Sequence, residues 1–351
     1  MPTRRQFLLR TTAGLAAALS SRISKAASAI VTNASKPARA AVVETLLGPL
    51  DISKLGFTLS HEHVCFVPHD LFPDKKTAAV KMVAKLKEAK AAGVDTIIDL
   101  TTSDVGRDVR FGQEVSRTSG MQIVAATGFR FAPESYNAQT LDQLAELYIR
   151  EIEHGIGDTG IKAGVIKAAG VSGALTPAEE KGFRAAARAS KATGVPIETH
   201  TNAGQRGGET QAAILEAEGV SPARVSLGHS DDTTDVPYLI GLAKRGYTIG
   251  IDHVFYGATK PSKGEPDYVT SLREIPWQTR AGYVKQLIDA GFGDKIFLSQ
   301  DWELEREQMN PDAFLFNTRH TIPYLKHQGV TQLQIQAITV DNPKRFFARG
   351  N

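Results

Sequence analysis

Residues 163–200 read AGVIKAAGVSGALTPAEEKGFRAAARASKATGVPIETH and contain the pattern of one complete strand–helix–strand unit. The short apolar runs at 163–168 and 195–200 have the length of buried strands. Between them, Thr176-Pro177-Ala178-Glu179 is a capping box with proline at the first helical position, which predicts where a helix begins. Gly194 supplies the left-handed residue at which helices commonly end. The unit therefore predicts two parallel strands joined by a helical crossover.

The same alternation continues on both sides of this unit. Amphipathic segments separate further short apolar runs, and in one of them Met82, Leu86 and Ala89 fall on a single helical face. Gly93 and Gly219 predict two further helix ends. Eight strands are expected, at residues 57–60, 95–100, 121–127, 163–168, 195–200, 224–229, 247–253 and 295–301.

Eight buried strands with helical crossovers predict the α/β class and, within it, a (β/α)8 TIM barrel. A doubly wound sheet is the rival architecture, but no glycine-rich phosphate-binding turn follows any of the expected strands. No repeat, linker or low-complexity stretch divides residues 41–348, so we expect a single domain.

Composition limits the class of protein independently of any motif. The chain has 351 residues, of which 42% are hydrophobic and 23% charged, so a disordered, collagen-like or coiled-coil protein is excluded. Cys65 is the single cysteine, which excludes an intrachain disulfide and a cysteine-based zinc site. The formal net charge is 41 − 38 = +3, but the first 29 residues hold five basic residues and no acidic one, leaving 36 − 38 = −2. That balance argues against nucleic acid or an anionic membrane as a partner.

The N-terminal segment has the features of a targeting signal. Residues 3–9, TRRQFLL, carry an arginine pair; the apolar stretch 11–19 follows, and Ala27-Ser28-Ala29 is a small-residue cleavage site. The segment resembles a twin-arginine export signal, and its apolar stretch is shorter than the roughly 20 residues that span a bilayer. We expect a cleaved signal at 1–29 and a mature domain at 30–351 without an integral membrane segment. The twin-arginine translocase would deliver it to the periplasm, free or peripherally associated with the membrane.

Changing Arg4-Arg5 to Lys-Lys is expected to leave full-length precursor in the cytoplasm, because the twin-arginine route reads the arginine pair itself. Immunoblots of periplasmic and cytoplasmic fractions measure this, with Arg22→Lys as a control in the same segment. Unchanged accumulation of the processed chain in the periplasm would contradict the export prediction.

Polar side chains able to bind a metal ion end most of the expected strands. In α/β barrels the carboxyl ends of the strands carry the active site. His61 and His63 are two residues apart on one strand, so both imidazoles face the same side. Five of the nine histidines in the chain lie at strand ends, namely His61, His63, His200, His229 and His253, and Lys167 and Asp301 accompany them.

This set holds more ligands than one tetrahedral zinc ion needs, which favours two divalent metals about 3.5–4 Å apart that share a bridging hydroxide. Lys167 is the unusual member, because burial beside two dications lowers the pKa of its ammonium group. A neutral amine in that position can capture carbon dioxide and become a carbamate able to bridge both metals.

These motifs resemble those of bacterial phosphotriesterases, the aryldialkylphosphatases of the amidohydrolase superfamily. The resemblance covers residues 41–348 and rests on six motifs: TLSHEH at 58–63, IK at 166–167, ETH at 198–200, GHSDD at 228–232, GIDH at 250–253 and SQDW at 299–302. It implies a zinc-dependent hydrolase that acts on a small-molecule ester and forms a homodimer. It also implies a binuclear site with His61, His63 and Asp301 on the more buried metal, His200 and His229 on the other, and carbamylated Lys167 bridging them.

The family mechanism implies cleavage of organophosphate triesters by attack of the metal-bridging hydroxide. Asp301 would accept the hydroxide proton and pass it through His253 to Asp232. Asp232 also has a structural alternative as a loop N-cap, because Ser230-Asp231-Asp232-Thr233 is favourable capping sequence. A metal-storage or solute-binding protein would need the ligands but no proton relay, so His253 and Asp232 favour an enzyme.

Two segments depart from the family pattern and concern the substrate. Arg130 stands where phosphotriesterases carry a tryptophan, while Trp302 is retained. The loop at 303–316 is shorter and more charged than its family counterpart. We expect Arg130, unless it is a solvated loop charge, and Trp302 to line the substrate pocket, with weaker activity on bulky apolar aryl esters. The alternative is a phosphotriesterase-like lactonase or carboxylesterase, although the sequence at 252–254, DHV, favours the phosphotriesterase branch.

Overall fold

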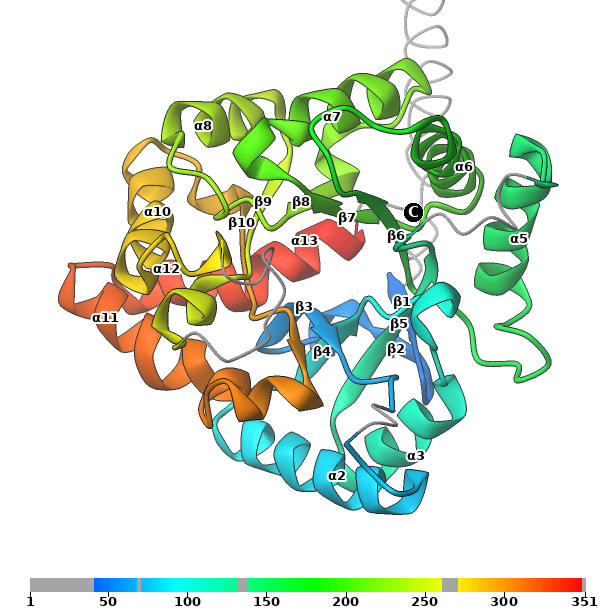
Figure 1. The fold of residues 1–351 in the computed structure, drawn as a ribbon, viewed down its shortest axis with the longest axis horizontal. Helices are drawn as coiled ribbons and strands as arrows, with labels where there is room; N and C mark the ends of the chain where they lie inside the picture. The colour runs from blue at the N-terminus through cyan, green and yellow to red at the C-terminus, as the bar shows by residue number, and fades with distance from the viewer. Residues whose placement is uncertain (1–40, 68–70, 132–137, 261–270, 349–351) are drawn as a thin grey trace, which may run out of the picture. The chain divides into compact units, whose positions relative to one another are not determined.

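The structure, a computed structural model, describes residues 41–67, 71–131, 138–260 and 271–348. The predicted export signal at 1–29 and the start of the predicted mature domain, residues 30–40, lie outside these residues. None of the described helices is long and apolar enough to cross a bilayer. The described chain is an α/β fold in which helices surround a curled parallel sheet (Figure 1).

Within the described residues nine parallel strands form the sheet, and eight of them lie where the sequence predicts strands. They are β3 (Thr58–His63), β4 (Thr96–Asp99), β5 (Gln122–Gly128), β6 (Val165–Gly170), β7 (Ile197–Thr201), β8 (Val225–Gly228), β9 (Thr248–Ile251), β10 (Ile296–Leu298) and β11 (Trp302–Glu303). Their hydrogen-bonded order is β10-β9-β8-β7-β6-β5-β4-β3-β11. Only residues 299–301 separate β10 from β11, although these strands end that order, so the sheet must curl back on itself. The α/β class is confirmed, and the curled sheet is consistent with the predicted (β/α)8 barrel.

Helices connect the strands in the predicted manner. In α6 (Pro177–Thr193) the predicted capping box is present. Glu179 N donates to Thr176 Oγ1 at 3.2 Å, and Thr176 N donates to Glu179 Oε2 at 2.7 Å. Gly194 ends that helix with a φ of 80°, and Met82, Leu86 and Ala89 are buried on α2 as predicted. The helices are α2 (Lys75–Ala91), α3 (Val109–Ser119), α5 (Leu141–Glu153), α6 (Pro177–Thr193), α7 (Gly207–Ala217), α8 (Val236–Arg245), α10 (Trp277–Asp289), α11 (Ile322–His327), α12 (Gln332–Gln336) and α13 (Asn342–Ala348).

A small apolar cluster fills the inner face of the strands and supports the functional residues. It joins side chains of β1 (Val42–Thr45), β4, β5, β6 and β10 to Phe346 and Phe347 of α13. Val165 of β6 belongs to this cluster, and Lys167 lies two residues further along the same strand. Because alternate residues of a strand share a face, Lys167 lies on the inner face, one step nearer the carboxyl end. The packed layer beneath it therefore fixes the floor of the site.

Three local features differ from the sequence prediction. β1 (Val42–Thr45) and β2 (Gly48–Asp51) form an antiparallel hairpin, and four-residue strands are too short to give a periodic signal. The first predicted strand, 57–60, continues to His63. The last, 295–301, is too long: β10 ends at Leu298, and Asp301 has a φ of 50°, which a strand cannot contain.

Candidate metal centre

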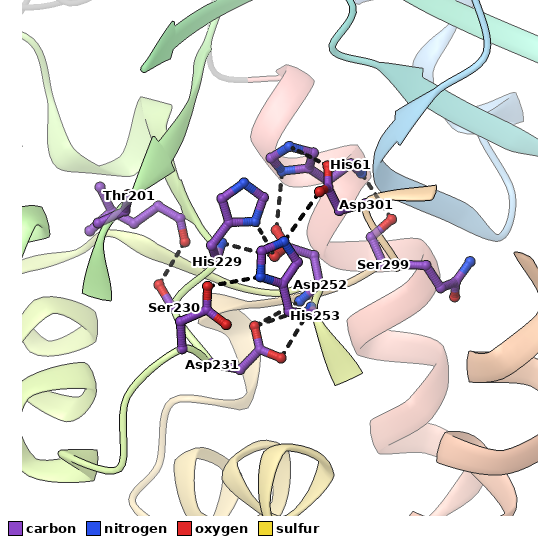
Figure 2. A network of polar contacts seen from close by, with 12 residues as sticks. His61, Thr201, His229, Ser230, Asp231, Asp252, His253, Ser299 and Asp301 are labelled. Atoms are coloured by element: carbon purple, nitrogen blue, oxygen red, sulfur yellow. Dashed lines mark hydrogen bonds and ion pairs between the residues drawn. The ribbon is translucent and has the colours of Figure 1, made fainter. Parts of the chain in front are cut away.

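The carboxyl ends of the strands bring the predicted site residues to one cavity of about 900 Å³. Figure 2 shows three of its imidazoles, those of His61, His229 and His253, gathered around the Asp301 and Asp252 carboxylates. The predicted residues that line the cavity are His61 and His63 of β3, Lys167 of β6, His200 of β7, His229 after β8, His253 after β9, Asp301 between β10 and β11, Asp232 and Arg130.

His61, His63 and Asp301 form the first group of potential ligands. His63 Nε2 lies 3.1 Å from Asp301 Oδ1, and His61 Nε2 lies 3.5 Å from the same oxygen. One ligand atom from each residue lies within 4.8 Å of the others. Asp301 is held in its left-handed conformation by its own N–H, which donates to the His61 carbonyl at 2.9 Å. The end of β3 and the segment between β10 and β11 thus bring two imidazole nitrogens and one carboxylate oxygen together.

Lys167 lies at the centre of the site rather than at its edge. Its Nζ is 2.8 Å from His61 Nε2, and the side chain is 1% exposed. Burial lowers the pKa of Lys167 to about 8, although the Asp301 and Glu198 carboxylates oppose that shift. The amine therefore loses its proton more readily than an exposed lysine does, and its neutral form can act as a nucleophile.

His200 and His229 lie side by side, with ring centroids 4.3 Å apart, and the His229 ring is 4.6 Å from that of His61. His229 has a φ of 55°, and its N–H donates to Asp252 Oδ1 at 2.8 Å. Among the described residues, positive φ outside glycine occurs only at Arg206, His229 and Asp301. Such backbone strain costs about 1–3 kcal/mol per residue and is typical of functional sites.

Asp252 orients two of the imidazoles at once, a role that the sequence analysis misses. Its Oδ2 lies 3.1 Å from His61 Nδ1, and its Oδ1 lies 2.8 Å from His229 Nδ1. Holding each ring by Nδ1 leaves Nε2 available as a metal ligand. Glu198, also missed, lies deeper, with Oε1 at 3.4 Å from His61 Nδ1, and burial raises its pKa well above the ordinary value.

The predicted relay residues form a continuous chain of contacts. His253 Nε2 is 3.2 Å from Asp301 Oδ2, and His253 Nδ1 is 2.8 Å from Asp232 Oδ2. Burial favours the neutral ring, but the Asp232 and Asp301 carboxylates outweigh it and raise the pKa of His253 well above its usual value. Arg280, a third residue that the sequence analysis misses, is buried on α10 and donates from Nη1 to Asp232 Oδ1 at 2.6 Å.

The chemistry of these donors fits a divalent transition metal. Burial lowers the pKa values of His61, His200 and His229, so their rings are neutral near neutral pH and can each offer a lone pair. Burial opposes ionisation of Asp301, but His253 and His63 hold its pKa well below the usual range. Neutral imidazoles combined with an ionised carboxylate are the ligand set that zinc and similar ions prefer.

A sequence model of the phosphotriesterase family matches residues 41–347. This chain belongs to the phosphotriesterase family. A phosphotriesterase homology protein of Mycobacterium tuberculosis is 37% identical over 335 residues, which cover 88% of this chain and 98% of that protein. An aryldialkylphosphatase of Saccharolobus solfataricus is 34% identical over 321 residues, covering 85% and 97% respectively. The solved structure of the phosphotriesterase from Mycobacterium tuberculosis has a TM-score of 0.78 at 36% identity, covering 88% of this chain and 98% of that one.

In this phosphotriesterase-family hydrolase, Trp302 does not occupy the position that the sequence analysis expects. Its side chain is fully buried and does not line the cavity. The indole N–H donates to Glu307 Oε1 at 3.0 Å, and the ring stacks on Phe314 at 4.0 Å between centroids. Trp302 therefore anchors the loop at 303–316 from below, and the expectation that it contacts substrate is corrected.

Charged side chains of that loop do reach the cavity of this family member. Glu303, Glu305 and Arg306 all line it, and Arg306 pairs with Glu303. Arg130 and Phe131 also line the cavity. These charged side chains make the cavity wall more polar than the apolar surface that an aryl leaving group would favour.

Proposed function

We propose that this chain hydrolyses phosphotriesters at a pair of divalent cations, with zinc as the first candidate. The observation that carries the proposal is the union of two features in one cavity: convergent imidazole and carboxylate ligands, and the contact chain from Asp301 through His253 to Asp232. Similarity to a protein named aryldialkylphosphatase supports the choice of triester over other esters.

Six residues would hold the two cations. His61, His63 and Asp301 would bind one, His200 and His229 the other, and Lys167, as a carbamate, would bridge both. Carbamate formation joins the neutral Lys167 amine to carbon dioxide and releases one proton, and the lowered pKa of Lys167 supplies the neutral amine. When bound, such a cation pair polarises the phosphoryl oxygen and lowers the pKa of water.

Asp301, together with His253 and Asp232, would move the proton that the attacking water loses. The charge of the bound cations would offset the carboxylates that raise the pKa of His253 and leave its ring neutral, with the proton on Nδ1. Asp301 Oδ2 would then accept the water proton and hand it to His253 Nε2, 3.2 Å away. The Nδ1 proton of His253 would move at the same time to Asp232 Oδ2, 2.8 Å away. Arg280 positions Asp232 from behind, so the acceptor at the end of the chain is fixed in place.

Metal analysis and activity assays on the purified protein test this proposal. We expect about two divalent metals per chain and hydrolysis of an aryl dialkyl phosphate that a chelator abolishes and zinc restores. His200→Ala should lose metal and activity, whereas His154→Ala, which removes an exposed imidazole outside the cavity, should lose neither. A single metal per chain with full activity would contradict the cation pair.

Side-by-side assays of a phosphotriester, a phosphodiester and a lactone test the reaction class. Lactone turnover far above that of every triester would replace the proposed activity with the lactonase or carboxylesterase alternative, which would use the same groups. Export to the periplasm and a homodimer remain predictions from the sequence.

A further inference from the structure

Arg130 is the feature of the cavity that a neutral triester leaves unexplained. We propose that Arg130 binds an anionic group on the substrate, so that the preferred substrate is an ester whose leaving group carries a carboxylate, sulfonate or phosphate. This inference rests on the proposed ester hydrolysis and specifies its substrate class.

The backbone places Arg130 next to the metal centre. β5 ends at Gly128, whose φ of 106° lets the chain pass the Lys167 carbonyl, where a Cβ would lie only 1.8 Å away. Phe129 N then donates to that same carbonyl at 3.1 Å. Arg130 follows directly, and its position is therefore tied to the strand that carries Lys167.

Asp104 fixes the turn that presents the guanidinium. One carboxylate oxygen, Oδ2, accepts the N–H of Arg130 at 2.9 Å and the N–H of Phe131 at 2.6 Å. The guanidinium carbon of Arg130 lies 4.5 Å from the centre of the Phe131 ring. That ring is 62% exposed, and it lines the cavity together with Val171, which is 45% exposed. The wall thus offers a flat cation beside an apolar surface.

Desolvation of the Arg130 guanidinium favours an anionic group over an apolar aryl group beside it. An apolar leaving group packed against Arg130 would remove water from the guanidinium and return no hydrogen bond, which is unfavourable. A carboxylate, sulfonate or phosphate can instead accept charge-assisted N–H bonds from the guanidinium. Phe131 and Val171 would contact the carbon skeleton that carries this anion.

A matched pair of esters measures this discrimination: diethyl 4-carboxyphenyl phosphate and its methyl carboxylate ester, which differ by one negative charge. Arg130→Leu should lower the ratio of kcat/KM for the acid to that for the methyl ester by about 10- to 100-fold, the loss typical of a charge-assisted hydrogen bond. Intrinsic reactivity differences between the two esters cancel when the variant ratio is divided by the wild-type ratio. Arg130→Lys should keep part of the preference, and Arg130→Trp should raise kcat/KM for the neutral ester.

Arg110→Leu is the matched control, because it removes the charge of an exposed arginine that does not line this cavity. That variant should leave the ratio unchanged. A ratio for Arg130→Leu within about threefold of wild type would overturn the inference.

Binding of unreactive analogues separates this inference from the proposed function. Calorimetry with diethyl 4-carboxybenzylphosphonate and its methyl ester should show the same loss of acid preference in Arg130→Leu. If the wild-type protein hydrolyses no ester but binds the acid analogue through Arg130, the reaction is wrong and the anion site stands. If it hydrolyses triesters while both analogues bind wild type and Arg130→Leu alike, the anion site is wrong and the reaction stands.

Discussion

Replacing Lys167 with alanine is expected to lower kcat for ester hydrolysis by about 10²–10⁴-fold. Lys167 is buried, and its Nζ touches His61 Nε2 at 2.8 Å, so its removal opens a gap inside the ligand cluster. Losing a bridge between two cations would forfeit several kcal/mol of transition-state stabilisation, at about 1.4 kcal/mol for each tenfold in rate. Steady-state kinetics and metal analysis of the purified variant measure both consequences.

A short carboxylic acid added to Lys167→Ala should restore part of the activity, since acetate or propionate can supply the missing carboxylate oxygens. Lys162→Ala is the matched control, because Lys162 precedes β6 and does not line the cavity. Neither this substitution nor the added acid should change kcat for ester hydrolysis. Native mass spectrometry of the wild-type protein should show the mass of the chain plus one carbon dioxide. This additional mass should disappear on acidification. Full activity of Lys167→Ala would show that the lysine bridges nothing.

The sequence could predict the strand ends because two simple rules act together. Each apolar run stops at a polar residue, and parallel strands bring their carboxyl ends to one edge of a sheet. His61, Lys167 and His200 therefore meet although more than a hundred residues separate the first from the second. The order of the parallel strands is therefore enough to predict that these three side chains lie close together.

What escaped prediction depends on contacts that no local pattern reports. Asp252 reads as the polar end of a strand, and only the folded chain shows one carboxylate bridging two imidazoles. Trp302 was expected beside the substrate because the residue type is retained, but the left-handed turn at Asp301 precedes a two-residue strand that buries the indole under the loop. A backbone reversal of this kind leaves no signature in hydrophobic periodicity.

Arg280 is another residue whose role no local sequence pattern reports. It lies 48 residues from Asp232, and nothing in the sequence of α10 marks it as part of the site. The residue reads as one more charge on an amphipathic helix. Its complete burial shows otherwise, since an arginine is almost never fully buried unless carboxylates or carbonyls receive it.

Replacing Arg280 with methionine is expected to destabilise the fold by about 3–5 kcal/mol, the cost of breaking a buried ion pair from one side. Arg280 Nη1 donates to Asp232 Oδ1 at 2.6 Å and to the Asp231 carbonyl at 2.7 Å, and Nη2 donates to the Leu272 carbonyl at 2.6 Å. Methionine fills much of the volume but leaves these oxygens buried without the cation. Denaturant unfolding of the wild type and the variant measures the loss.

Two comparisons make this prediction specific. Arg245→Met removes an exposed pair with Glu216 and should cost only about 0–1 kcal/mol, because water solvates both charges there. Arg280→Lys keeps the charge without the planar fork and should fall between the two. If the arginine also positions the relay, kcat of Arg280→Met should fall by about 10- to 100-fold with little change in KM, since Asp232 would no longer be held against His253. An Arg280→Met protein as stable as Arg245→Met would mean that the buried carboxylates adapt without a cation. An unchanged kcat in Arg280→Met would mean that Arg280 does not position Asp232.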